Sequence, residues 1–153
     1  MKMVVSQELL ELYGAKDETA FIEQMHSKTV NTLIEALEIK YVELSLDRVV
    51  MTMPVGPKTR QPAGILHGGA SVALAETAAS VATALNVDLT KYNPVGLEIN
   101  ANHIRSKQEG TVTAIATPLH KGRTTMIWEI KIVDEDEKLI CVSRCTMAVI
   151  AKK

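Results

Sequence analysis

The chain has 153 residues and a mass of 16.7 kDa, a length that fits one domain. Its apolar fraction of 46% excludes a disordered chain, and at a net charge of −1 it carries no basic stripe of the kind that nucleic-acid binding requires. No apolar run approaches the roughly 20 residues of a membrane span, and the N-terminus turns polar too early for a signal peptide. We therefore expect a cytoplasmic protein that binds neither nucleic acid nor membranes.

The first third of the chain is expected to be helical and then to change to strands. Apolar residues recur at helical spacing in three segments, residues 6–14, 17–27 and 30–37. Apolar and polar residues then alternate through residues 38–55, which predicts a pair of strands with a turn at Asp47 and Arg48. Residues 56–64, GPKTRQPAG, are typical of a loop because of their Gly and Pro content.

A long helix is predicted over residues 68–85. This stretch has seven alanines and apolar residues on nearly every side, so we expect most of the helix surface to be buried. Gly68 and Gly69 at its start leave backbone N–H groups uncovered, and the helix dipole adds partial positive charge there. The start of this helix is therefore a candidate site for an anion or a developing oxyanion.

Further strands are expected after the helix, at about 95–106, 110–120, 124–134 and 139–150. One helix after two strands, followed by a run of strands, predicts an α+β fold with an antiparallel sheet. Cys141 and Cys145 lie in the last strand, where their Cα atoms would be roughly 13 Å apart, too far for a disulfide. We expect two reduced, partly buried thiols and no metal site.

Glu76 is the one carboxylate in the long helix. A buried charge is costly, so Glu76 either meets a structural partner or is a catalytic carboxylate whose pKa is raised by burial. Gly68 and Glu76 are eight residues apart, which is about 12 Å along one helix. One helix cannot bring both groups to a single carbonyl, but two antiparallel copies can. A catalytic Glu76 therefore predicts a homodimer with shared sites.

Three sequence blocks resemble the hot-dog-fold thioesterases: RQPAGILHGGASVALAETAASVA, VGLEINANHIRS and PLHKGRTTMIWEIKIVDEDEKLICVSR. The most similar subgroup holds the 4-hydroxybenzoyl-CoA and 1,4-dihydroxy-2-naphthoyl-CoA thioesterases. The resemblance begins at about residue 35 and runs to the C-terminus. It implies an antiparallel sheet wrapped around a central helix, and one domain over 1–153 with residues 1–34 as a helical extension.

The same resemblance implies roles for individual residues. Glu76 corresponds to the nucleophile or general base, and Gln61 to the residue that positions the thioester or the attacking water. The Gly68 N–H corresponds to the oxyanion donor, and His67 to a residue that orients the site. Ser80 matches a hydroxyl that holds the carboxylate or water. The structural alternatives are a helix cap for His67 and an ordinary loop position for Gln61.

The resemblance implies that a second group of residues binds CoA, and the Arg and Lys side chains among them can bind its phosphates. The alternative is that these histidines and cations are ordinary solvated side chains at the ends of strands. The group consists of Gly96, His103, Arg105, Ser106, His120, Lys121, Gly122, Arg123 and Thr124.

The function implied by the resemblance is hydrolysis of an aromatic acyl-CoA, with 1,4-dihydroxy-2-naphthoyl-CoA of menaquinone biosynthesis as the example. It implies no cofactor and no metal, and a homodimer that pairs into a homotetramer. Two alternatives stay open, a hot-dog dehydratase acting on an acyl thioester and a non-catalytic acyl-CoA-binding module.

Overall fold

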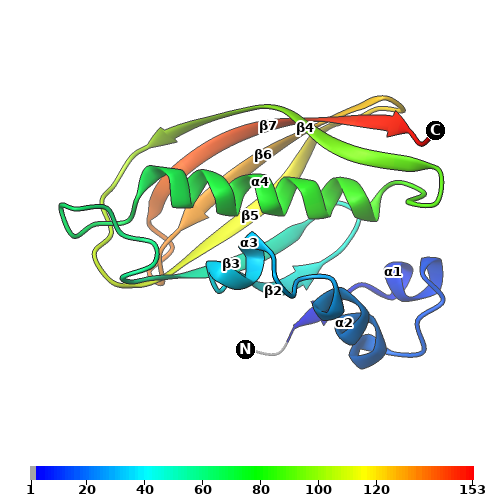
Figure 1. Cartoon of the computed structure of the whole chain (residues 1–153), viewed down its shortest axis with the longest axis horizontal. Helices are drawn as coiled ribbons and strands as arrows, with labels where there is room; N and C mark the ends of the chain where they lie inside the picture. Colours follow the sequence, from blue (N-terminus) through cyan, green and yellow to red (C-terminus); the bar gives the residue numbers. More distant parts are fainter. Residues whose placement is uncertain (1–2) are drawn as a thin grey trace.

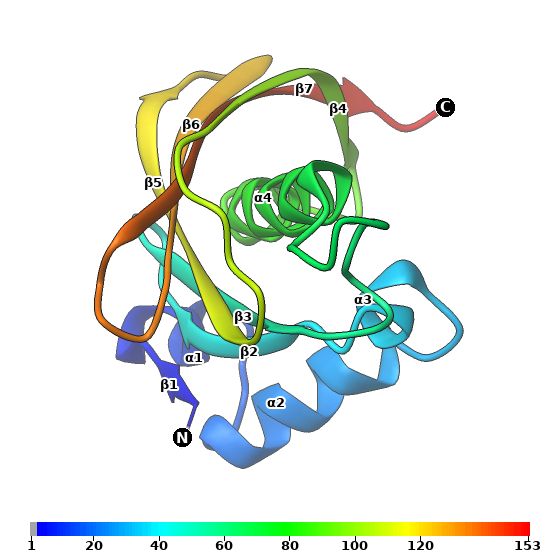
Figure 2. The ribbon, with the colours of Figure 1, turned by 90° about the vertical axis from the view of Figure 1, so that its left-hand side faces the viewer.

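The computed structural model describes residues 3–153, in which a curved sheet wraps around one long helix (Figures 1 and 2). The chain begins with β1 (Val4–Val5), α1 (Gln7–Leu12), α2 (Glu18–Ser27), α3 (Leu33–Ala36), β2 (Lys40–Leu44) and β3 (Val49–Val55). It continues with the central helix α4 (Gly68–Leu85), β4 (Tyr92–His103), β5 (Gly110–Lys121), β6 (Thr125–Val133) and β7 (Leu139–Ala151). This arrangement confirms the predicted hot-dog fold.

The seven strands form one sheet in the order β1-β2-β3-β5-β6-β7-β4. Every pair is antiparallel except β1 with β2, which run parallel. The parallel pair differs from the all-antiparallel expectation. β1 has only two residues and shows no alternation, and the three short helices between β1 and β2 return the chain in the parallel sense. At the opposite edge, β4 has a neighbour on one side only.

The predicted boundaries are confirmed most closely for α4, which spans residues 68–85 as expected. The helix expected at 30–37 is only one turn, α3. Asn31 before it and Glu38 after it both adopt positive φ angles, 60° and 56°, which a continuous helix cannot accommodate. β4 begins and ends three residues earlier than expected.

The helix α4 packs one face against the inside of the sheet. Leu74, Ala78 and Ala79 are fully buried there, and small side chains allow the strands to approach the helix backbone. Buried polar groups on this face are paired: the Trp128 indole N–H donates to Thr83 Oγ1 at 2.9 Å. The opposite face is only partly buried and is bordered by α3, but Gly69 is the one exposed residue of α4, so most of the helix surface is buried as expected.

The N-terminal segment packs beside β2 and β3 (Figure 1). Its first two helices, α1 and α2, are capped by Ser6 and Asp17, whose side chains accept backbone N–H groups of the first turn. Leu9 and Phe21 are fully buried in the same core as the sheet. This shared core supports our proposal that residues 1–153 form one domain with a helical extension. No helix within residues 3–153 combines the length and the apolar character needed to cross a membrane.

Candidate active site

A tight turn delivers the chain to the start of α4. The Gly64 N–H donates to the Gln61 carbonyl at 2.9 Å, and the Gln61 N–H donates to the Ile65 carbonyl at 2.9 Å. Gly64 has a φ of 79°, a left-handed conformation that glycine adopts without strain. Gln61 Oε1 accepts the Ala63 N–H at 3.2 Å. Within residues 3–153 the Gln61 side-chain NH₂ group has no acceptor, so it is available to a ligand.

His67 is the N-cap of α4, with Nδ1 accepting the Gly69 N–H at 2.8 Å. A nitrogen that accepts a hydrogen bond carries no proton, so this contact fixes the tautomer with hydrogen on Nε2. The Gly68 N–H has no acceptor among the residues described and lies at the positive end of the helix dipole. His67 thus acts as a helix cap, and Gly68 supplies a free donor beside it.

The N-terminal end of α4 opens into a pocket of about 270 Å³. The His103 imidazole lies against the start of the helix, and its Nε2 is 2.7 Å from the point that a Cβ on residue 68 would occupy, so a side chain at position 68 would require the imidazole to move. The pocket therefore brings together five of the predicted site residues: Gln61, Gly68, His103, Arg105 and Ser106.

Glu76 lies elsewhere, in a hollow of about 530 Å³ along the open face of α4. Its side chain is only partly buried in the protomer, which differs from the buried carboxylate expected from the sequence. No donor or cation of residues 3–153 is paired with this carboxylate, so the structural-partner alternative finds no support within the chain. Ser80 lines the same hollow, with its hydroxyl 3.9 Å from the Met147 sulfur.

Gly96 of β4 packs against the Glu76 carboxylate. Glu76 Oε1 is 2.6 Å from the position of a Cβ on residue 96, so a side chain there would displace the carboxylate. The pairing of β4 with β7 shifts register between Gly96 and Glu98, which identifies a β-bulge at this point. The structure therefore places Gly96 beside the carboxylate rather than beside the cations with which it was grouped.

The remaining predicted CoA-binding residues lie in the β5–β6 turn at the other end of α4: His120, Lys121, Gly122, Arg123 and Thr124. Lys121 Nζ is 2.5 Å from Asp47 Oδ1 and 3.2 Å from Oδ1 of Asn86, the C-cap of α4. This ion pair fixes the turn at the C-terminal end of the helix. One protomer therefore does not bring this turn together with Arg105.

The sequence did not predict several residues around Glu76. Val72 and Ala73 precede Glu76 by four and three residues, so their position on the same helix face was a usable signal, whereas Thr77 directly follows Glu76. Leu33 and Ile34 of α3 also line the hollow, and no local pattern indicates that they approach α4.

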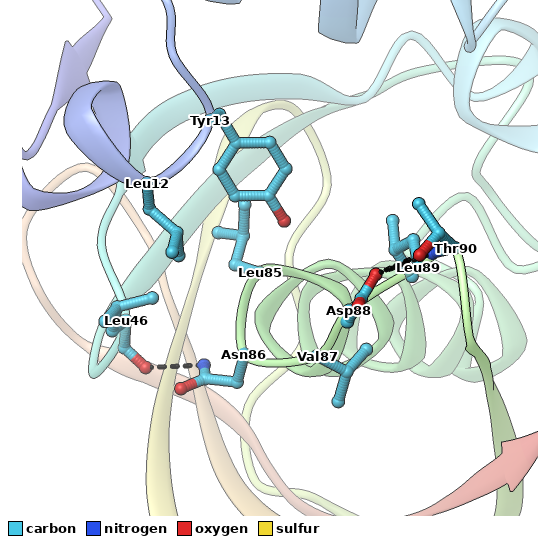
Figure 3. Close-up of a pocket in the computed structure, with 9 residues that line it drawn as sticks. All are labelled: Leu12, Tyr13, Leu46, Leu85, Asn86, Val87, Asp88, Leu89 and Thr90. Atoms are coloured by element: carbon cyan, nitrogen blue, oxygen red, sulfur yellow. Dashed lines mark hydrogen bonds between the residues drawn. The ribbon is translucent and has the colours of Figure 1, made fainter.

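A further hollow, of about 610 Å³, lies between α1 and the C-terminal end of α4 (Figure 3). Its polar groups are already paired: the Tyr13 hydroxyl donates to the Ala84 carbonyl at 3.2 Å, and Asn86 Nδ2 donates to the Leu46 carbonyl at 2.8 Å. Hydrogen bonds from Thr90 and an ion pair with a neighbouring lysine lower the pKa of the Asp88 carboxyl to about 2. These polar side chains are hydrogen-bonded or ion-paired within the described chain, whereas the Glu76 carboxylate is not.

The two cysteines are free and buried, which confirms the prediction of reduced thiols. Burial, together with the nearby carboxylates of Glu76 and Glu98, raises the pKa of the Cys145 thiol to about 12. Burial also raises the pKa of Cys141. Protonated thiols are poor nucleophiles, so neither cysteine is a candidate nucleophile.

Known proteins resemble this chain over most of its length. The model of the thioesterase superfamily matches residues 63–141. ComA2 of Bacillus subtilis is 60% identical over 122 residues, covering 80% of this chain and 97% of that protein. The 1,4-dihydroxy-2-naphthoyl-CoA hydrolase of Listeria monocytogenes is 50% identical over 121 residues, covering 79% of this chain and 98% of that enzyme.

The crystal structure of a variant thioesterase from Pseudomonas aeruginosa superposes with a TM-score of 0.83 at 43% identity, covering 86% of this chain and 94% of that chain. The chain belongs to the thioesterase superfamily and is a thioester hydrolase.

Proposed function

We propose that this enzyme hydrolyses an aromatic acyl-CoA to the free acid and CoA, with 1,4-dihydroxy-2-naphthoyl-CoA of menaquinone biosynthesis as the substrate to test first. The observation that carries the proposal is the unpaired Glu76 carboxylate in a largely apolar hollow. An apolar wall suits an aromatic acyl group, and a relative at 50% identity is named for this substrate.

Glu76 acts in one of two ways. As a general base, its carboxylate accepts a proton from water while the water oxygen attacks the thioester carbon. The C–S bond then breaks, and the CoA thiolate takes the proton back from Glu76. As a nucleophile, Glu76 forms a mixed anhydride and releases CoA, and water then hydrolyses the anhydride. In both routes the Gly68 N–H stabilises the oxyanion. In ¹⁸O-labelled water, a single turnover leaves label in Glu76 only by the nucleophilic route, with water attacking the Glu76 carbonyl of the anhydride; attack at the acyl carbonyl puts the label in the product acid.

The active enzyme is a homodimer in this proposal, with Glu76 of one subunit facing Gly68 and Gln61 of the other. Within one chain Gly68 and Glu76 lie in different hollows, about 12 Å apart along α4. The open face of α4 and the β4 edge, where Val95 and Leu97 are 43% and 63% exposed, are the surfaces available for pairing. Pairing of two such dimers would give the expected tetramer.

An antiparallel pair of α4 helices would also gather the CoA-binding residues. The β5–β6 turn lies at the C-terminal end of α4 and Arg105 at its N-terminal end. Opposite ends of one helix become neighbours across a two-fold axis that relates antiparallel helices. We therefore assign the CoA phosphates to Arg105 of one subunit and Arg123 of the other, with Lys121 fixing the turn through Asp47.

The activity test measures thiol release from a panel of CoA thioesters, comparing 1,4-dihydroxy-2-naphthoyl-CoA and benzoyl-CoA with short and long aliphatic chains. The highest kcat/KM is expected for the aromatic substrates. A preference for short aliphatic chains would reject the aromatic proposal. Binding without thiol release would indicate the acyl-CoA-binding module, and release of water from a β-hydroxyacyl-CoA without thiol would indicate the dehydratase.

The shared site is tested by mixing two inactive variants, Glu76→Ala and Gln61→Ala, after reversible dissociation. A mixed dimer has one site with both native residues and one with neither, so random pairing restores about a quarter of the wild-type activity. If each site were contained within one chain, the mixture would stay inactive.

A further inference from the structure

The short helix α3 lies below α4 in the view of Figure 2. It borders the hollow that contains Glu76. Leu33 and Ile34 of α3 line this hollow opposite α4. Ile34 packs against the core, whereas the Leu33 side chain is 58% exposed. Covering this exposed leucine with an apolar group would lower the free energy of the complex, because apolar surface is removed from water.

Both ends of α3 are fixed by hydrogen bonds. The Ile39 N–H donates to the Ile34 carbonyl at 2.9 Å and the Glu38 N–H to the Glu35 carbonyl at 3.0 Å, which together form a Schellman motif. At the other end the Asn31 N–H donates to Glu35 Oε2 at 2.7 Å. A single turn held in this way presents Leu33 at a defined place, as a specificity pocket requires.

The chemistry of the hollow suits an acyl group and does not suit the CoA phosphates. The wall is formed mainly by apolar side chains and contains no cation. The Thr77 hydroxyl is already engaged, donating to the Ala73 carbonyl at 2.7 Å. At about 530 Å³, the hollow falls within the range of small-molecule pockets.

We propose that α3 forms one wall of the acyl pocket and that Leu33 determines which acyl group the enzyme accepts. The group it selects is apolar and broad enough to contact both α4 and Leu33, as an aromatic ring system is. This inference rests on the proposed role of Glu76. It gives the N-terminal segment a function, because the residue that selects the substrate lies at the end of that segment.

The test compares kcat/KM for benzoyl-CoA, 1,4-dihydroxy-2-naphthoyl-CoA and butyryl-CoA in the full-length enzyme. Leu33→Ala is expected to lower kcat/KM for the two aromatic substrates roughly tenfold relative to butyryl-CoA, the effect of removing one apolar contact. Leu33→Trp narrows the hollow, so it should reduce turnover of the bicyclic substrate most and that of butyryl-CoA least.

Val30→Ala is the matched control, because Val30 is 59% exposed on the same segment but does not line the hollow. The control should leave kcat/KM for all three substrates unchanged.

An unchanged ratio of kcat/KM for the aromatic substrates to kcat/KM for butyryl-CoA, in both Leu33 variants, would overturn the inference while leaving the hydrolase function in place. Loss of dimer in Leu33→Ala, measured by analytical ultracentrifugation, would also overturn it, because a second copy would then be the occupant. A wild-type enzyme that hydrolyses none of the three substrates would instead reject the proposed function.

Discussion

The two faces of α4 have similar residue types but different surroundings. On the inner face, Leu74, Ala78 and Ala79 have no exposed surface and pack against the sheet. On the open face, Val72 and Glu76 are only partly buried and line a hollow. Small side chains on the inner face allow close packing, whereas on the open face they leave space for a ligand. In our proposal the inner face of α4 serves stability and the open face serves catalysis, so substitutions on the two faces should have different consequences.

The largest expected effect is on the open face. Glu76→Gln keeps the size of the side chain but removes the base or nucleophile, so kcat should fall at least about a thousandfold. The melting temperature should not fall, because this carboxylate has no partner within residues 3–153. Thiol release and thermal unfolding measure the two quantities. Glu129→Gln, on β6 away from the hollow, serves as the control that retains activity.

The next largest effect is expected on the inner face of α4, where Leu74→Ala leaves a cavity between the helix and the sheet. We expect a loss of about 3 kcal/mol in the free energy of unfolding, measured by urea denaturation. KM should be unchanged at a temperature where the variant is folded. The matched substitution on the open face, Val72→Ala, should cost less than about 1 kcal/mol, because Val72 is partly exposed. Equal losses at the two positions would contradict the distinction between the faces.

Gly96→Ala tests the contact between β4 and the open face. The new Cβ would lie 2.6 Å from Glu76 Oε1, and the flexible end of Glu76 would move away. We expect kcat to fall about tenfold with little change in KM or in melting temperature. Gly56→Ala is the control, since a Cβ there meets nothing within 4 Å. A loss of stability without a loss of kcat would show that Gly96 is needed only for the strand.

The smallest effect concerns Cys145, which is buried in β7. Its folded-state pKa of about 12 exceeds the value of about 8.5 for an unfolded chain, so only the unfolded chain ionises at intermediate pH. The stabilisation is complete below about pH 8.5 and is lost as the pH rises toward 12, by about 1 kcal/mol at pH 9.5. Urea denaturation at pH 8 and pH 9.5 measures this loss. Cys145→Ala should reduce the difference between the two pH values.

Local patterns predicted most of the fold. The bounds of α4 follow from Gly68 and Gly69 at its start and from the run of helix-forming residues after them. The strands β5, β6 and β7 alternate apolar and polar residues because one face of each is buried. The pairing of β1 with β2 and the single turn of α3 were not predicted, since two- to four-residue elements carry too little periodicity.

Residue types and family resemblance supplied candidate site residues, but they did not predict how those residues are grouped in space. The structure gathers Gln61, Gly68 and His103 at one end of α4 and leaves Lys121 at the other. Such groupings depend on which strands are neighbours in the sheet, and the order of the strands cannot be predicted from any short segment of sequence.

The sequence by itself determined that one carboxylate lies about 12 Å along a helix from a glycine N–H, because the rise of an α-helix is fixed at about 1.5 Å per residue. Only the tertiary structure decided that this carboxylate faces an open hollow and that Leu33 lies across from it. Those facts depend on how segments distant in the chain pack together, and the free energy of that packing belongs to the whole core rather than to any local pattern.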